Sequence, residues 1–166
     1  MKRNTKKLTA LAMTISFALI LSYIESRIPA FVAIPGIKVG LANIAVIFTL
    51  YKFGTKEAVL VSLLRVLLVS MMFGNPISMI YSIAGAVLSL GSMILLKRLT
   101  SLNEVTVSVV GGVMHNVGQI ATASVMLSTN VITYYLPFLI LSGTIAGIAV
   151  GIASALLVKR INLKTK

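Results

Sequence analysis

Four polar residues that could do chemistry lie inside otherwise apolar segments of this 166-residue chain. Arg65 falls near the middle of one apolar run, where a charged side chain costs about 2.5–3.5 kcal/mol at the centre of a bilayer. His115, Asn116 and Gln119 fall together in another run. His115 and Gln119 are four residues apart, so they would share one face of a helix. If all four lie at one depth, they could form a polar cavity that binds an anionic or carbonyl-bearing ligand.

Each of these residues also has a plainer interpretation. Arg65 could instead bind carbonyls or polar side chains inside a helix bundle, or extend toward the cytoplasmic interface. A carboxylate would be its usual partner, but Glu25, Glu57 and Glu104 all fall at the ends of apolar runs. A single histidine in a bundle, here His115, is more often an interhelical hydrogen-bonding group than a ligand contact. The sequence leaves these alternatives open.

Two further residues are weaker candidates for the same ligand site. Asn43 lies near the outer end of the second apolar run, and Lys38 lies in the loop before it. This loop, residues 25–40, is rich in proline and glycine and is long for a connection. Because long loops are often lids or binding elements, we expect it to close the ligand site from outside.

The composition indicates an integral membrane protein. Apolar residues make up 58% of the chain, charged residues 11%, and the mean hydropathy is +1.03. Residues 105–158 contain no Asp, Glu, Lys or Arg, and about 20 apolar residues suffice to cross a bilayer. The net charge of +12 comes from basic residues placed between apolar runs. A nucleic-acid-binding protein would gather them in one patch, so we expect no nucleic-acid partner.

We therefore predict an all-α fold in which residues 1–166 form one domain, a bundle of six transmembrane helices. The first apolar run follows a basic stretch, as in a signal peptide, but it is longer than usual and lacks an A-x-A-like cleavage site, so we expect it to be retained. The predicted spans are Leu8–Tyr23, Val39–Tyr51, Glu57–Phe73, Ile77–Leu96, Val105–Leu127 and Tyr134–Val158.

The basic residues also predict the orientation. With six spans and both termini in the cytoplasm, twelve Lys and Arg residues lie inside, two lie outside and Arg65 lies within a span. This distribution fits the positive-inside rule. We expect a multi-pass protein of the cell membrane with both termini cytoplasmic.

Small residues recur at every fourth position in the first and last predicted spans. This spacing keeps them on one helix face and lets another backbone approach closely. We expect the face on the last span to pack inside the bundle, whereas the face on the first could equally contact another protein. The residues are Gly143, Gly147, Gly151 and Ala155 in the last span, and Ala10, Thr14 and Ala18 in the first.

Several chemistries are not expected. Gly54-Thr55-Lys56 lacks the pattern of a nucleotide-binding P-loop. The chain has no cysteine, and its three acidic residues are far apart in sequence, so neither a thiolate metal site nor a carboxylate cluster for magnesium can be drawn. We expect no enzymatic activity, no metal and no cofactor.

Several segments resemble one known family. They are Ile34–Ile44, Lys56–Ala58 followed by Leu64–Leu68, Gly112–Gln119 and Tyr134–Pro137. The chain resembles the Gx transporter family, labelled heptaprenyl diphosphate synthase component I. That family is similar to the substrate-binding (S) components of energy-coupling factor (ECF) transporters.

The resemblance implies a function. S components bind a vitamin-like solute from outside and dock on a transmembrane T subunit, which couples them to two cytoplasmic ATPases. An A-x-x-x-A motif on the first helix often makes the docking contact. The matching residues here are Ala10, Thr14 and Ala18, where Thr14 departs from alanine. The alternatives are a membrane accessory protein in quinone- or flavin-linked electron transfer, or a noncatalytic partner of a prenyl diphosphate synthase, although such synthases use aspartate-rich sites that this chain lacks.

Overall fold

The fold is helical throughout the described part of the chain. The structure is a computed structural model, and it describes residues 2–27, 40–129 and 131–161. Within these ranges there are six α-helices, one 3-10 helix and no strand, which confirms the predicted fold class. The helices are α1 (Lys2–Arg27), α2 (Asn43–Lys52), α3 (Thr55–Phe73), α4 (Pro76–Leu99), α5 (Glu104–Met126), η1 (Val131–Tyr135) and α6 (Leu136–Arg160).

Two boundaries differ from the prediction in ways that affect the site. α1 continues to Arg27, so Glu25 belongs to a helix and not to the loop in which the sequence placed it. α2 begins only at Asn43. Gly40 precedes it with a φ of +83°, a conformation that glycine adopts without the steric cost that a side chain would bring.

The short α2 does not cross a bilayer on its own. Its 10 residues extend about 15 Å at 1.5 Å per residue, half the thickness of the hydrocarbon core. Residues 45–50 are all buried, so α2 is an internal helix enclosed by its neighbours. Its apolar character therefore reflects a position in the core of the protein.

Three of the described helices are long and apolar enough to span a membrane. The corresponding segments are Thr5–Arg27, Pro76–Leu99 and Val131–Arg160. α3 and α5 are also long, but they carry the polar residues discussed above. The chain is a multi-pass membrane protein.

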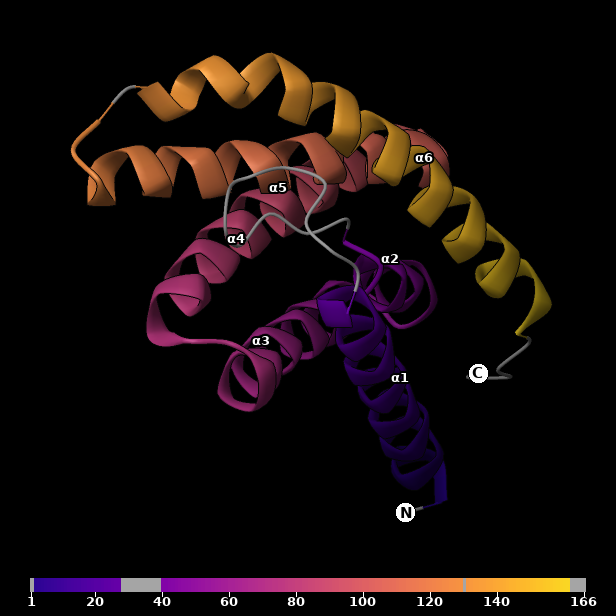
Figure 1. The fold of residues 1–166 in the computed structure, drawn as a ribbon. Coiled ribbons are helices and arrows are strands. Elements are labelled where there is room, and N and C mark those ends of the chain that lie inside the picture. Colours follow the sequence, from indigo (N-terminus) through magenta and orange to yellow (C-terminus); the bar gives the residue numbers. More distant parts are fainter. Residues whose placement is uncertain (1, 28–39, 130, 162–166) are drawn as a thin grey trace.

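The six helices form two halves (Figure 1). α1, α2 and α3 pack on one another, and α5 packs between α4 and α6. α2 contacts α6, and α3 contacts α4, which joins the halves. The apolar core lies at this junction and contains Ile47 and Leu50 of α2, Met93 of α4, Val107 of α5 and Val150 of α6.

Glycines allow α5 and α6 to approach closely. A Cβ atom added at Gly112 would lie 2.5 Å from the carbonyl oxygen of Gly143. One added at Gly147 would lie 2.6 Å from Cα of Val109, and one at Gly151 would lie 2.7 Å from Cα of Val105. The prediction that this stripe packs inside the bundle is confirmed.

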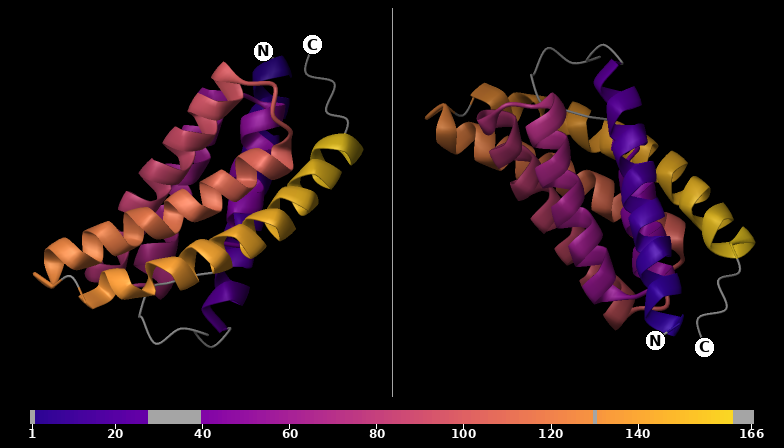
Figure 2. Two further views of the ribbon diagram at one scale, coloured as in Figure 1. Left: turned by 90° about the horizontal axis from the view of Figure 1, so that it is seen from above. Right: turned by 90° about the horizontal axis from the view of Figure 1, so that it is seen from below.

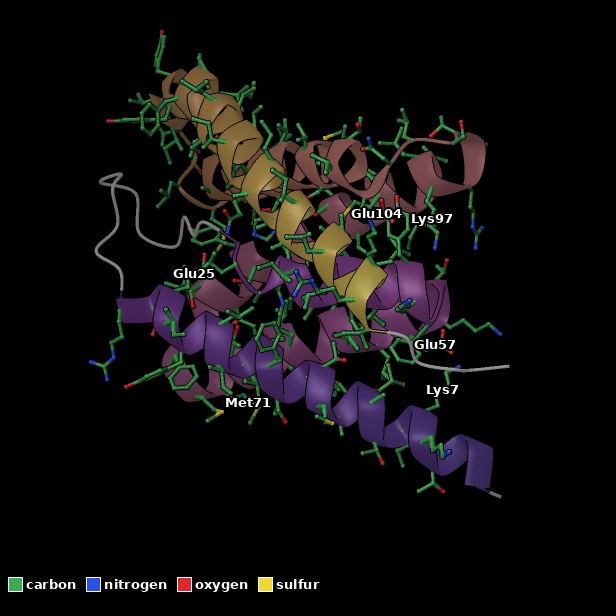
Figure 3. All side chains as sticks on the ribbon, turned by 90° about the vertical axis from the view of Figure 1, so that its right-hand side faces the viewer. Lys7, Glu25, Glu57, Met71, Lys97 and Glu104 are labelled. Atoms are coloured by element: carbon green, nitrogen blue, oxygen red, sulfur yellow. The ribbon has the colours of Figure 1, made fainter. Side chains whose placement is uncertain are left out.

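Apart from Arg27 and Arg65, the described basic residues lie toward one end of the molecule. The start of α1 and the α4–α5 connection lie at this end (Figure 2). Lys7 of α1 contacts Glu57 of α3 there, and Lys97 of α4 donates a hydrogen bond to the carbonyl of Leu50 in α2. Glu25 lies at the opposite end (Figure 3). We call these the basic end and the Glu25 end.

The orientation in the membrane can be tested directly. The chain has no cysteine, so single cysteines introduced at the exposed residues Thr5, Asn75 and Thr100 can be labelled without background. We expect a membrane-impermeant maleimide to label the Asn75 variant in intact cells. The Thr5 and Thr100 variants should be labelled only after permeabilisation, because they lie at the basic end. Labelling of Thr5 in intact cells would contradict the orientation.

Candidate functional site

Arg65, His115 and Gln119, which lie in two separate helices, line one cavity in the structure. Its volume is about 30 Å³, enough for about two water molecules by the usual threshold of 10–15 Å³ for one. It lies between α1, α3, α4 and α5, near the Glu25 end. The residues that line it are Ser22, Glu25, Gly40, Arg65, Val66, Val69, Ser70, Ser82, His115 and Gln119.

Arg65 is deeply buried and has an acidic neighbour. Only 8% of the residue is exposed, and its charge interacts with that of Glu25. The guanidinium Nε finds no hydrogen-bond partner in the described part of the chain. A buried charge is tolerated when an opposite charge compensates for its desolvation. The expectation that Arg65 has no carboxylate near it was therefore wrong.

Glu25 reaches the cavity because α1 does not end where the sequence suggested. It lies on the buried face of α1 with Thr14, Ala18 and Ser22, at spacings of four, four and three residues. This helical spacing was visible in the sequence and could have identified Glu25. The side chain accepts a hydrogen bond from the backbone N–H of Gly40. The contact joins the end of α1 to the turn before α2 and closes one side of the cavity.

A glycine that sequence analysis missed makes room for His115. A Cβ atom at Gly85 of α4 would lie 2.9 Å from both Cε1 and Nδ1 of the imidazole ring. His115 thus occupies space that any larger residue at position 85 would fill. Nothing in the local sequence distinguishes Gly85 from other packing glycines, so only the structure shows this role.

Asn116 does not belong to the cavity. Its side-chain amide donates a hydrogen bond of 2.8 Å to the carbonyl oxygen of Leu139 in α6. Asn116 is one residue, or about 100°, around the helix from His115. It shares a face with Gly112, which also meets α6. In this structure Asn116 connects two helices and is not among the residues that line the cavity. Its predicted role in ligand binding stays a prediction.

Replacement of Asn116 by alanine should therefore affect stability and leave the cavity intact. We expect a loss of about 1–2 kcal/mol, because the carbonyl of Leu139 would lose a buried hydrogen bond. The variant is tested by thermal unfolding in detergent, in which the fraction of protein that stays monodisperse is recorded at each temperature. Any solute that co-purifies with the protein should be retained. Loss of that solute at unchanged stability would return Asn116 to the ligand site.

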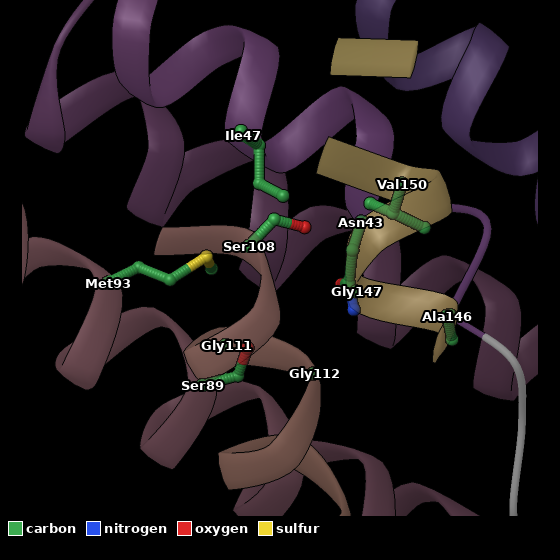
Figure 4. Close-up of a pocket in the computed structure, with 11 residues that line it drawn as sticks. Asn43, Ile47, Ser89, Met93, Ser108, Gly111, Gly112, Ala146, Gly147 and Val150 are labelled. Carbon is green, nitrogen blue, oxygen red and sulfur yellow. The ribbon is translucent and has the colours of Figure 1, made fainter. Parts of the chain in front are cut away.

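The structure describes only one of the two weaker candidates for the ligand site, Asn43 and Lys38. Asn43 lines a separate cavity of about 10 Å³ between α2, α4, α5 and α6 (Figure 4). Gly40 lines both cavities, so the two are neighbours. Lys38 lies outside the described residues, as does most of the predicted lid loop.

The predicted docking residues face inward. Ala18 is fully buried, Thr14 is buried with its hydroxyl bonded to the carbonyl of Ala10, and Ala10 is half-buried. Among the small residues that α1 exposes are Ala12 and Ser16, also four residues apart. A role of Ala10, Thr14 and Ala18 in docking stays a prediction, and it requires α1 to move away from the bundle.

The site is a cavity with one cation, one anion, an imidazole, an amide and several hydroxyl groups. Arg65 and Glu25 supply opposite charges, so the cavity offers both hydrogen-bond donors and acceptors to a polar group. No group of three or more His, Cys, Asp or Glu is placed to hold a metal in the described residues.

Together these features define a class, the multi-pass helical membrane proteins that enclose a polar cavity between their helices. The family description of heptaprenyl diphosphate synthase component I matches residues 14–157, and the chain belongs to this family. No curated protein and no solved structure matched the chain.

Proposed function

We propose that this protein is the substrate-binding S component of an ECF-type importer and takes up a small, vitamin-like solute. The observation that carries the proposal is the buried Arg65 in a polar cavity with Glu25, His115 and Gln119. Ionisable residues inside a membrane are rare, and they commonly mark substrate or ion pathways. The cavity lies near the Glu25 end, which faces outward if the basic end is cytoplasmic.

The chemistry of the cavity suggests the class of solute. The guanidinium of Arg65 offers planar donors to a carboxylate or a carbonyl group. Glu25 offers acceptor oxygens to an amine, an amide or a hydroxyl group. We infer a solute with an acidic or carbonyl-rich portion and at least one donor, a description that fits many vitamins.

Binding of such a solute requires the cavity to open. Small-molecule sites usually have volumes of roughly 300–1,000 Å³, about ten times the 30 Å³ of this cavity. α1 covers the cavity with Ser22 and Glu25, and it packs mainly on α2 and α3. We propose that the Glu25 end of α1 separates from the bundle when the solute enters.

The proposal includes partners. The chain has no nucleotide-binding motif of its own, so ATP hydrolysis must come from other subunits. For an S component these are a T subunit and two cytoplasmic ATPases. The exposed face of α1 with Ala12 and Ser16 is the small-residue surface open to another membrane helix. We place the contact with the T subunit there.

This contact can be tested by adding bulk. The double variant Ala12→Leu/Ser16→Leu should block co-purification of a T subunit while the isolated protein stays folded, since both residues are exposed. Ala121→Leu, on an exposed position of α5, is the matched control and should leave the complex intact. Unchanged co-purification of the double variant would refute the assignment.

The test of the function itself is to identify what the protein carries. The protein is purified in mild detergent, its retained small molecules are measured by mass spectrometry, and co-purified proteins are identified. A retained vitamin-like solute together with ATPase subunits would support the S-component function. A retained quinone or flavin with redox proteins, and no ATPase, would favour the second hypothesis, an accessory protein of electron transfer.

We also propose that the chain is not itself a prenyl diphosphate synthase. Its three acidic residues are all glutamates. Glu25 interacts with Arg65, Glu57 contacts Lys7, and Glu104 begins α5. Purified protein should therefore form no prenyl diphosphate from allylic and isopentenyl diphosphates with magnesium, and product formation would contradict the proposal.

A further inference from the structure

A third and larger cavity opens on the outer surface between α3 and α4. It is a groove of about 290 Å³, roughly ten times the volume of the Arg65 cavity. Apolar side chains form its walls, and Ser62 is the one polar side chain among the residues that line it. Leu63 is 49% exposed and Val87 is 60% exposed. Because it opens away from the bundle, the groove faces the hydrocarbon of the bilayer.

Gly91 gives the groove its depth. A Cβ atom added at Gly91 would meet nothing within 4 Å. By contrast, one added at Gly111 would lie 2.6 Å from Sδ of Met93 and would disturb the packing of α4 on α5. Gly91 is therefore not required for close helix packing, and its missing side chain leaves open the space in the groove.

The helix faces that form the groove each carry a cation toward the basic end. On α3, Lys56 precedes Val59 by three residues, and on α4, Arg98 follows Ile94 by four. At these spacings each cation shares a helix face with its groove residue. Both Lys56 and Arg98 are exposed.

The neighbouring charges point elsewhere. The ammonium group of Lys97 bonds to the carbonyl of Leu50 and lies 4.6 Å from the centre of the Tyr51 ring. Glu57 contacts Lys7 on α1. Lys56 also interacts electrostatically with Glu57, but the carboxylate of Glu57 bonds to Lys7. Lys56 and Arg98 are therefore the two cations nearest in sequence to the groove residues that do not take part in these hydrogen bonds.

We propose that the groove binds an anionic glycerophospholipid from the leaflet at the basic end. One acyl chain fills the apolar groove over Gly91, and the headgroup phosphate lies between Lys56 and Arg98. Basic sites between helices at the cytoplasmic surface bind acidic lipid headgroups in this way. Arg98 can contact phosphate oxygens with two parallel hydrogen bonds, and Lys56 supplies a compact charge.

A lipid fits these features better than a partner helix. A helix is about 10–12 Å across with its side chains, far wider than an alkyl chain. A single alkyl chain can enter the space over Gly91. The cations at one end of an apolar groove also complement an amphiphile whose charge is at one end.

The experiment uses native mass spectrometry of the full chain with two probes, phosphatidylglycerol and phosphatidylcholine of equal chain length. We expect the wild-type protein to prefer phosphatidylglycerol. The variant Lys56→Gln/Arg98→Gln should lose roughly thirty-fold in affinity for it, about 2 kcal/mol at about 1 kcal/mol for each cation. Lys159→Gln/Arg160→Gln, two exposed cations at the end of α6, removes the same charge and should keep the preference.

A third variant tests the groove separately from the charge. Gly91→Leu should fill the groove, remain folded because its side chain enters open space, and reduce binding of phosphatidylglycerol at least tenfold. Inorganic phosphate at millimolar concentration should not compete, because the acyl chain contributes to binding.

Four results would overturn the proposal. They are equal binding of the two lipids by the wild-type protein, equal losses in the α3–α4 and α6 charge variants, unchanged binding by Gly91→Leu, and displacement of the lipid by free phosphate. If the same variants abolish binding of a protein partner and leave lipid binding unchanged, the groove is instead a docking site for a helix of that partner. Size-exclusion chromatography shows that each variant is folded, and Lys56→Arg/Arg98→Lys should retain the lipid preference.

Discussion

Replacement of Arg65 by methionine should lower the free energy of unfolding by about 3 kcal/mol, and neutralisation of Glu25 should recover much of this loss. Both residues are buried in one cavity, and their charges interact. Removal of one member of such a pair leaves the other charge buried without compensation, which costs more than the pair contributes when intact. Arg65→Met and Glu25→Gln should each destabilise the protein, and the double variant should be more stable than the sum of the two changes predicts.

A double-mutant cycle measures this coupling. Reversible unfolding in mixed micelles gives the free energy for the wild-type protein, the two single variants and the double variant. Ser70→Ala, which removes a hydroxyl from the same cavity without changing its charge, is the control. Additive effects of the two substitutions would show that Glu25 and Arg65 are not coupled and would contradict the electrostatic account of the cavity.

The same variants separate a structural from a ligand-binding role of Arg65. Loss of a charged hydrogen bond to a solute weakens binding by roughly ten- to hundredfold. We therefore expect Arg65→Met/Glu25→Gln to lose the co-purified solute although its stability is largely restored. Retention of the solute by this double variant would mean that Arg65 is a packing residue only.

The second large effect is expected at Gly147. A Cβ atom there would lie 2.6 Å from Cα of Val109 and 3.0 Å from the carbonyl oxygen of Ser108. Because these are backbone atoms, α6 must move away from α5 to accept even alanine. Gly147→Ala should lower the free energy of unfolding by about 1–3 kcal/mol, the usual cost of overpacking. Gly147→Leu should yield no monodisperse protein.

Gly91 provides a matched control in α4. It is also a glycine within a long apolar helix, but its Cβ atom would meet open space. Gly91→Ala should be neutral or stabilising by about 0.5–1 kcal/mol, since alanine has less conformational freedom to lose. The two substitutions are compared by thermal unfolding in the same detergent. Equal effects would show that close packing of α5 on α6 does not determine stability.

Helical periodicity predicted part of the site correctly. His115 and Gln119 share a face because they are four residues apart, and the structure places both in the cavity of Arg65. The same periodicity does not say which neighbour each face of α5 meets. Asn116 lies on the face toward α6, with Gly112, and so it bonds to Leu139 and not to the cavity.

The sequence by itself determined that this is a helical, multi-pass membrane protein and which polar residues lie within its apolar runs. These properties follow from local patterns, because a bilayer requires long apolar segments whose backbone groups are satisfied within each helix. Only the tertiary structure decided that Glu25 accompanies Arg65, that α2 is a short internal helix, and that Gly85 makes room for His115. Each of these depends on contacts between helices far apart in the chain. Side-chain spacing within one helix shows which residues share a face, as Glu25 does with Ser22, but not which helix that face meets.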